Sequence, residues 1–371
     1  MKRLHRIFSA GVGVVCLCAG LAFLNRIAGG PFYTRNVPEK IRYLAGAREP
    51  ATILLLGTSV TYRHLDPHVI DSAFPPPASN IPNHTVNLGV SDFRMTELRE
   101  AVDILLSQQR EPKPLIVIEM GVSPYAQRKN DRALFSHTVR NLSYHLGIDF
   151  RRSFQYVAFP ASLLRAASEF AETIEQTTAH ATKRGLLIDW WRAQFGPRSF
   201  AEIFPTHISH RGYYPHTLTT LFEDDPSAYK SRRSFVAAHP DFLSEAQLAE
   251  RRLRDGDLSS LPEARDNTDF PEQFRMMKQL QDHGYPVLAY LPPRANLGVC
   301  HLFRQEVPED LAVIDLCDPY AFAELFETRY RVDSEHLHEE GARILNRYFA
   351  QKLHRPLLRA RLSPPVNHGI Y

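Results

Sequence analysis

The sequence predicts an α/β protein in which the strands form one parallel sheet and helices cover its faces. Short apolar runs predict the strands, and they lie at residues 52–56, 84–90, 115–121, 286–291 and 311–316. The first run is apolar without alternation, as in a strand buried on both faces of a parallel sheet. Apolar residues at helical spacing follow the second run, at Met95, Leu98, Val102, Leu105 and Leu106. This β-α-β-α-β order implies parallel strands joined by right-handed crossovers.

The composition is that of a folded protein that does not bind nucleic acid. A chain of 371 residues can form one large domain, or one domain with a substantial insertion. A hydrophobic fraction of 44% with 27 prolines suits a globular protein with many loops. Lys and Arg total 44 against 41 Asp and Glu, so the net charge is only +3. No cluster of basic residues of the kind that follows a phosphate backbone stands out.

The N-terminus predicts a membrane anchor within residues 1–30. A basic start, Met1–Arg6, precedes an uncharged stretch at residues 7–24. About 18 helical residues at about 1.5 Å each span about 27 Å, which is just enough for a bilayer core. The basic flank keeps the N-terminus in the cytoplasm and sends the rest of the chain across, with residues 31–50 as a tether. The alternatives are a signal peptide cleaved near residues 28–30 and a buried helix.

The four cysteines form two groups. Cys16 and Cys18 lie inside the predicted anchor, whereas Cys300 and Cys317 flank the region before the last motif. The second pair is a disulfide in an oxidising compartment and two free thiols in the cytosol. We expect the disulfide, because the predicted anchor directs this part of the chain out of the cytoplasm.

The alternation of strands and helices stops between residues 122 and 266, which we interpret as a large, mostly helical insertion. Helical stretches are expected at residues 161–181 and 244–254, with aromatic and basic loops at 190–192 and 207–216. An insertion at the carboxyl edge of a sheet often shapes a substrate site, and a solvated appendage is the alternative. The histidines match no ordinary zinc spacing, so we expect no metal. The sheet domain then comprises residues 51–121 and 267–355, followed by a tail at 356–371.

Ser59 is the candidate nucleophile. It follows Gly57 at the carboxyl end of the first strand, the edge where ligands bind in open α/β sheets. Serine needs a base to take its proton and a third group to orient that base. Asp333 and His336 supply both in one loop, and their spacing lets the aspartate reach Nδ1 and leaves Nε2 for Ser59. No cofactor is needed for such chemistry.

Each candidate has a structural alternative. Ser59 can be a helix cap, and His336 can be a structural histidine. His338 is spaced less well from Asp333, so we expect it to support the site from outside. The nucleophile turn G-x-S-x-G of α/β-hydrolases is absent, because Thr61 occupies the position of its second glycine. A different scaffold for a serine hydrolase is therefore needed.

The motifs resemble those of the SGNH (GDSL-like) hydrolase superfamily. Three blocks carry the resemblance in the family's order, namely Gly57-Thr58-Ser59, Asn87-Leu88-Gly89 and Asp333-x-x-His336-Leu337 with Gly341. Together they cover roughly residues 51–121 and 267–352. The resemblance implies a flavodoxin-like three-layer α/β/α fold and an ester as the substrate. It also implies that Ser59 attacks, His336 is the base, Asp333 orients it, and the N–H groups of Ser59 and Gly89 hold the oxyanion.

The sequence departs from the family pattern at two blocks. Thr58 replaces the aspartate of the first block, which is a common variation. The third block usually contains Gly-x-Asn-Asp, whose asparagine donates to the oxyanion, but residues 118–123 contain no asparagine. Loss of one oxyanion donor costs on the order of 10²–10³ in rate, so either another donor replaces it or catalysis is weak. Asn87 is a candidate to orient its loop or to donate a hydrogen bond.

The layout with one anchor is similar to that of envelope members of the superfamily of the DltD and alginate-acetylation types. This similarity implies an extracytoplasmic serine esterase or O-acyltransferase that acts on acyl esters, acetyl above all, of an envelope glycan. The membrane and a membrane-bound acyl donor are the implied partners. The alternative is a slow or non-catalytic protein that binds envelope polysaccharide or partner proteins, through residues such as Trp190, Trp191 and Tyr213.

Overall fold

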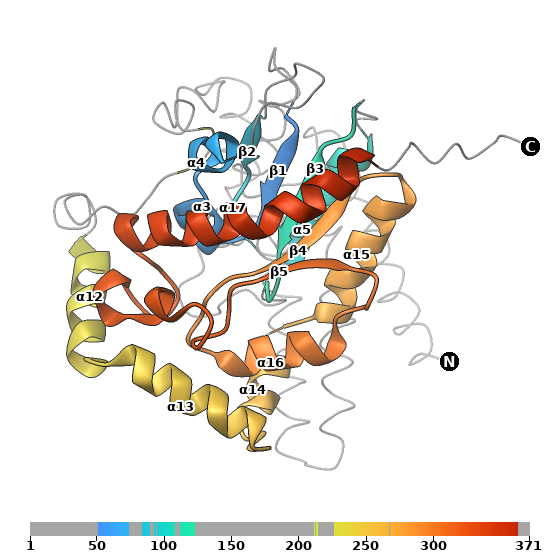
Figure 1. Ribbon diagram of the computed structural model, residues 1–371. Helices are drawn as coiled ribbons and strands as arrows, with labels where there is room; N and C mark the ends of the chain where they lie inside the picture. The colour runs from blue at the N-terminus through green and yellow to red at the C-terminus, as the bar shows by residue number, and fades with distance from the viewer. Residues whose placement is uncertain are drawn as a thin grey trace, which may run out of the picture. The chain divides into compact units, whose positions relative to one another are not determined.

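The residues that the structure describes fold around a five-stranded parallel sheet (Figure 1). The computed structural model describes residues 51–73, 84–89, 93, 95–107, 112–122, 211, 213, 226–266 and 268–362. The strands are β1 (Ile53–Leu56), β2 (Thr85–Asn87), β3 (Leu115–Glu119), β4 (Val287–Leu291) and β5 (Ala312–Asp315). Each strand lies within one of the five predicted runs, so the predicted α/β class with a parallel sheet is confirmed.

The strand order is β2-β1-β3-β4-β5, which is one of the two common orders of doubly wound sheets. Ile53 of β1 pairs with Thr85 of β2 on one side and with Leu115 of β3 on the other. The chain therefore moves from β1 to one neighbour and then crosses back to the opposite one. The carboxyl end of β1 lies at this reversal, which is where ligands bind in such sheets.

Two groups of helices cover the sheet. The first contains α3 (Ser59–His64), α4 (Pro67–Ser72) and α17 (Glu339–Leu362), and α17 contacts both of the others. The second contains α5 (Met95–Ser107), α15 (Phe270–Asp282) and α16 (Leu297–Glu306), and α15 contacts both of the others. Because the crossovers on either side of β1 run in opposite directions, the right-handed rule places these groups on opposite faces.

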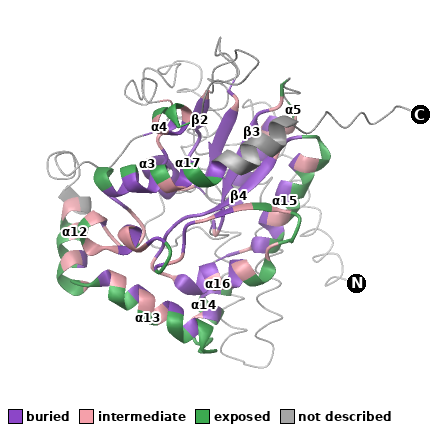
Figure 2. Cartoon of the chain, viewed as in Figure 1, coloured by how far each residue is buried: buried purple, intermediate pink, exposed green. Residues whose placement is uncertain are grey.

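The core is the set of strands buried between these groups, drawn purple in Figure 2. All four residues of β1 and all five of β3 and of β4 are buried. Burial on both faces explains the uninterrupted apolar runs in the sequence. Tyr290 of β4 packs edge-on against Phe349 of α17, with 5.1 Å between the ring centroids.

In the described part of the chain between β3 and β4, the first helices are α12 (Pro226–Ala238), α13 (Phe242–Arg254) and α14 (Leu261–Asp266). The predicted helix at 244–254 is thus present as part of α13. Both α13 and α14 contact α16, and α13 also contacts the 3₁₀ helix η2 (Ala323–Phe326). These helices belong to the same compact unit as the sheet, which comprises residues 36–125 and 203–371. The unit therefore includes residues that we assigned to the insertion.

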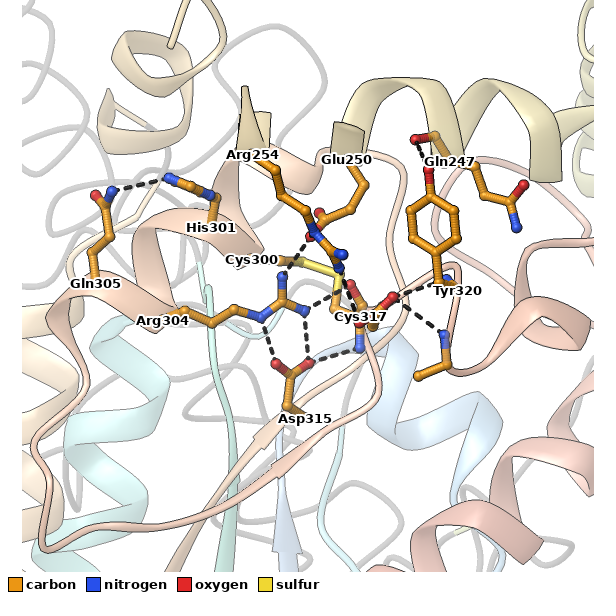
Figure 3. A network of polar contacts seen from close by, with 12 residues as sticks. Gln247, Glu250, Arg254, Cys300, His301, Arg304, Gln305, Asp315, Cys317 and Tyr320 are labelled. Atoms are coloured by element: carbon orange, nitrogen blue, oxygen red, sulfur yellow. Dashed lines mark hydrogen bonds and ion pairs between the residues drawn. A yellow bond between two sulfur atoms is a disulfide. The ribbon is translucent and has the colours of Figure 1, made fainter. Parts of the chain in front are cut away.

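A polar network and a disulfide fasten α13 and α16 to the end of β5 (Figure 3). Arg304 of α16 forms an ion pair with Asp315 at 2.7 Å and with the buried Glu250 of α13 at 3.4 Å. Cys300 of α16 forms a disulfide with Cys317, two residues past β5. Both cysteines are buried.

The structure describes part of the C-terminal end of the chain but not the predicted N-terminal anchor. Helix α17 continues through Pro356 to Leu362, so residues 356–362 are helical where we expected an irregular tail, and residues 363–371 lie outside the described residues. Proline has a φ that suits a helix and removes only one N–H donor, so a long helix can pass through it at a cost. The predicted anchor, the tether, Trp190 and Trp191 lie outside the described residues. Within the described ranges, no helix combines the length and apolar character needed to cross a bilayer.

Candidate active site

Ser59, His336 and Asp333 form one hydrogen-bonded chain. Ser59 is the first residue of α3, directly after β1, and its Oγ lies 2.8 Å from His336 Nε2 across 277 residues of sequence. His336 Nδ1 lies 3.0 Å from both carboxylate oxygens of Asp333. His336 and Asp333 lie in the loop between the 3₁₀ helix η3 (Thr328–Tyr330) and α17. The structure thus brings together the three residues that the sequence predicts as nucleophile, base and orienting acid.

Asp333 is held in its charged form. Burial by itself raises the pKa of Asp333, but the hydrogen bond and charge of His336 lower it, and the backbone N–H groups of Glu335 and His336 lower it further. The net result is a pKa well below the ordinary value of an aspartate. An ionised Asp333 accepts the Nδ1 proton of His336, so Nε2 is left as the acceptor for the Ser59 hydroxyl.

Arg331 fixes the backbone of this loop from beneath. Its side chain is fully buried and donates to the carbonyl oxygens of Leu325 at 2.9 Å, Asp333 at 3.1 Å and Ser334 at 2.6 Å. Its guanidinium lies 4.9 Å from the ring centroid of Phe242 in α13. Burial lowers the pKa of Arg331 to about 10, so it remains charged at neutral pH. The helices before residue 267 therefore help to hold the loop of the candidate acid and base.

The C-terminal end of α3, the helix that begins at Ser59, is hydrogen-bonded to the loop that contains His336. The Leu337 N–H donates to Nε2 of His64, the last residue of α3, at 2.8 Å. Asn346 of α17 donates to the His64 carbonyl oxygen at 2.7 Å and accepts from the Asp66 N–H at 2.9 Å. These contacts link α3, α17 and the residue after His336, so Ser59 and His336 are held relative to each other.

Glu119, the last residue of β3, lies under the turn that presents Ser59. Its carboxylate accepts hydrogen bonds from the N–H and the hydroxyl group of Thr58 and from the N–H and the hydroxyl group of Thr61. A Cβ at Gly57 would lie only 2.4 Å from Glu119 Oε2, so the close approach requires glycine. Our sequence reasoning gave Glu119 no role, and its only signal is a charged residue that ends an apolar strand.

The Ser59 N–H is available as an oxyanion donor. Within the part of the chain that the structure describes, no group accepts a hydrogen bond from it. The neighbouring N–H groups are engaged, since Val60 donates to Thr58 Oγ1, and Thr58 and Thr61 donate to Glu119. The N-terminal end of a helix carries partial positive charge, which favours an anion at this position.

Asn87 and Gly89 are engaged with each other and with α3. The buried Asn87 donates from Nδ2 to the carbonyl oxygens of Thr61 at 2.8 Å and Leu65 at 2.7 Å, and its Oδ1 accepts the Gly89 N–H at 2.8 Å. Asn87 therefore donates hydrogen bonds to α3 and its C-cap and also orients the Gly89 loop. A Cβ at Gly89 would lie 2.5 Å from the Tyr62 backbone nitrogen, so glycine allows α3 to pack closely.

His338 and Tyr213 are engaged elsewhere. His338 Nε2 lies 2.7 Å from the Arg329 carbonyl oxygen and its Nδ1 accepts the Glu340 N–H at 3.2 Å, so this ring fixes the start of α17. Tyr213 is only 6% exposed, and burial raises its pKa, with the charges of Asp66 and Glu339 adding to the effect. Tyr213 is therefore a packed side chain and not an exposed aromatic surface for a glycan.

Among the described residues, no group of three or more His, Cys, Asp and Glu side chains is arranged to hold a metal ion. Comparison with known proteins adds no family, because no protein-family model matches the chain and no curated protein matches its sequence. The geometry of the site and the resemblance of its motifs are therefore what point to a function.

Proposed function

We propose that this protein is a serine esterase or O-acyltransferase of the SGNH type that forms an acyl-enzyme on Ser59. The observation that carries the proposal is the hydrogen-bonded chain from Ser59 Oγ through His336 to Asp333, with distances of 2.8 and 3.0 Å. The strand order and the position of Ser59 at the reversal of that order support it, since flavodoxin-like sheets have this order.

In the first half of the reaction, Ser59 Oγ attacks the carbonyl carbon of the ester while His336 Nε2 takes the hydroxyl proton. The ionised Asp333 stabilises the positive charge that develops on the imidazole ring. The Ser59 N–H donates to the oxyanion of the tetrahedral intermediate. The intermediate then collapses, the C–O bond to the alcohol breaks, and His336 gives its proton to the departing oxygen.

In the second half, the acyl group leaves Ser59 for an acceptor. His336 removes a proton from water or from an acceptor hydroxyl, which attacks the acyl carbon. The bond between the acyl carbon and Ser59 Oγ then breaks, and His336 returns the proton to Ser59 Oγ. Water gives hydrolysis and a sugar hydroxyl gives transfer, and both use the same acyl-enzyme. The accessibility of the site to water therefore decides which outcome dominates.

We place the protein outside the cytoplasm, with an acetyl ester of an envelope glycan as its substrate. The uncharged stretch at residues 7–24 supports a membrane anchor. The disulfide between Cys300 and Cys317 supports an oxidising compartment. The substrate class rests on the similarity to anchored envelope members of the superfamily, in which a membrane-bound donor supplies the acyl group.

A slow or non-catalytic binding protein is the second candidate, and two observations favour it. The Gly89 N–H donates to Asn87 Oδ1, so it must leave this acceptor before it can bind an oxyanion. Residues 118–123 also lack the asparagine of the family's third block. Among the described residues, the Ser59 N–H is then the one donor of the expected set that has no acceptor.

Fluorophosphonate labelling of the purified full-length chain in detergent separates the two candidates. The esterase proposal expects covalent labelling that disappears in Ser59→Ala and His336→Ala. Ser334→Ala is the matched control. Ser334 is exposed in the same loop, and the contacts from Arg331 and Ala295 are to its backbone carbonyl oxygen, which alanine keeps. Absence of labelling in a folded wild type would overturn the esterase proposal and favour the binding protein.

A further inference from the structure

We propose that Glu119 is a positioning residue for the nucleophile, and that its buried carboxylate fixes the turn so that Ser59 Oγ remains in contact with His336 Nε2. The consequence for catalysis rests on the function proposed above, whereas the positioning itself does not. The inference comes from the contacts of Glu119 and from the place of Ser59 between the two residues that it binds.

The contacts of Glu119 bracket the serine. Oε2 accepts from the Thr58 N–H at 2.8 Å, from the Thr61 N–H at 3.2 Å and from the Thr61 hydroxyl at 2.7 Å, while Oε1 accepts from the Thr58 hydroxyl at 2.7 Å. Thr58 directly precedes Ser59, and Thr61 follows it by two residues. A single carboxylate therefore fixes both sides of the serine.

The environment of Glu119 requires these contacts. The residue is only 1% exposed, and a buried carboxylate is costly unless donors and positive charge surround it. Arg294 supplies the charge, with Nη2 at 3.8 Å from Glu119 Oε1. Arg294 also donates to the Met120 carbonyl oxygen at 2.9 Å, which holds the guanidinium at the end of β3.

Glutamine cannot accept all four hydrogen bonds. The two backbone N–H groups can only donate, so the group that faces them must be an acceptor. The amide oxygen of glutamine can replace Oε2, but its NH₂ group then faces the Thr58 hydroxyl. This hydroxyl donates to Glu119 in the wild type, so it would have to turn and accept a second hydrogen bond beside the one from the Val60 N–H. Glu119→Gln therefore keeps the shape and removes the charge and part of the anchoring.

Two further sets of variants separate an effect on the position of Ser59 from an effect on general stability. Glu250 of α13 is also a buried glutamate paired with arginines, but its partners belong to the network near the disulfide (Figure 3). Glu250→Gln thus has a similar chemical change without contact to the nucleophile turn. Thr61→Val removes one hydroxyl donor to Glu119 at nearly constant shape, and Thr61→Ser restores it.

The test measures the state of His336 directly. Histidine-selective ¹³C labelling of the full-length chain in detergent gives an NMR titration of each imidazole, and His336→Ala assigns the resonance. Ser59→Ala sets the titration expected when the Ser59–His336 contact is lost. The second readout is the rate constant for fluorophosphonate labelling, which depends on the activated serine.

We expect Glu119→Gln and Thr61→Val to shift the His336 titration toward that of Ser59→Ala, and Thr61→Ser and Glu250→Gln to leave it unchanged. The labelling rate of Glu119→Gln should fall by about 10²-fold, because a displacement of a reacting group by about 1 Å can lower a rate by that factor. An unchanged His336 titration in Glu119→Gln beside a shifted one in Ser59→Ala would overturn the positioning proposal, and so would an unchanged labelling rate of Glu119→Gln. Absent labelling of the wild type would overturn the esterase proposal alone, because the titration still decides the role of Glu119.

Discussion

Asp333→Asn should abolish most of the reactivity of Ser59 while leaving the fold intact. Asp333 Oδ1 accepts the Glu335 N–H at 2.8 Å and the His336 N–H at 2.7 Å, and an asparagine oxygen can keep both contacts. The asparagine NH₂ group then faces His336 Nδ1, which must become an acceptor. The ring proton moves to Nε2, and Nε2 can no longer accept the proton of Ser59.

The magnitude follows from this change of tautomer. The same substitution in the serine-protease triad lowers the rate about 10⁴-fold with the geometry unchanged. At about 1.4 kcal/mol for each factor of ten, this loss corresponds to about 5 kcal/mol of transition-state stabilisation. The Asp333→Asn variant should therefore be labelled by a fluorophosphonate about 10⁴-fold more slowly than the wild type.

The assay compares labelling rate constants and thermal unfolding of the wild type, Asp333→Asn and Asp241→Asn. Asp241 caps α13 away from the site, and asparagine caps helices about as well, so this control should label normally. If Asp333→Asn reacts within about tenfold of the wild type, the orienting role of Asp333 and the reasoning about the tautomer are wrong.

The pH dependence of stability tests the same carboxylate. Because the folded-state pKa of Asp333 lies below its unfolded value, the group contributes stability above the unfolded pKa of about 3.9. This contribution is lost as the pH falls through the folded-state pKa. The stability difference between the wild type and Asp333→Asn should therefore shrink on acidification, as measured by urea unfolding from about pH 6 downward. A constant difference would contradict the lowered pKa.

Three further substitutions test the surroundings of the site. Replacing Cys300 and Cys317 by alanine opens a link of sequence separation 17, which should lower the free energy of unfolding by about 3 kcal/mol in urea titrations under non-reducing conditions; equal stability would show that the link is dispensable. Arg331→Met leaves three carbonyl oxygens without their charged donor, so we expect a loss of about 3 kcal/mol or more in the same assay. Gly89→Ala places a Cβ 2.5 Å from the Tyr62 nitrogen and should cost about 1–3 kcal/mol, read as a lower melting temperature; an unchanged value would mean that α3 can shift freely.

The sequence by itself determined the elements and the local motifs. The five strands could be predicted because burial on both faces leaves a purely local mark, a short apolar run that ends at a turn. The spacing of Asp333 and His336 is also local, and in the structure it gives the 3.0 Å contact between them. The position of Ser59 after Gly57 could also be predicted locally, because a turn at the end of a strand depends on adjacent residues.

Only the tertiary structure decided which residues support these motifs. Glu119 contacts Thr58 across 61 residues of sequence, and His336 contacts Ser59 across 277. Such contacts depend on the strand order and on the register of the sheet, and no periodicity in the sequence encodes either. The contacts of Asn87 with the carbonyl oxygens of Thr61 and Leu65 likewise became visible only with the packing of α3 against β2. Patterns specify local conformation, whereas hydrogen bonds between distant segments are specified by the whole fold.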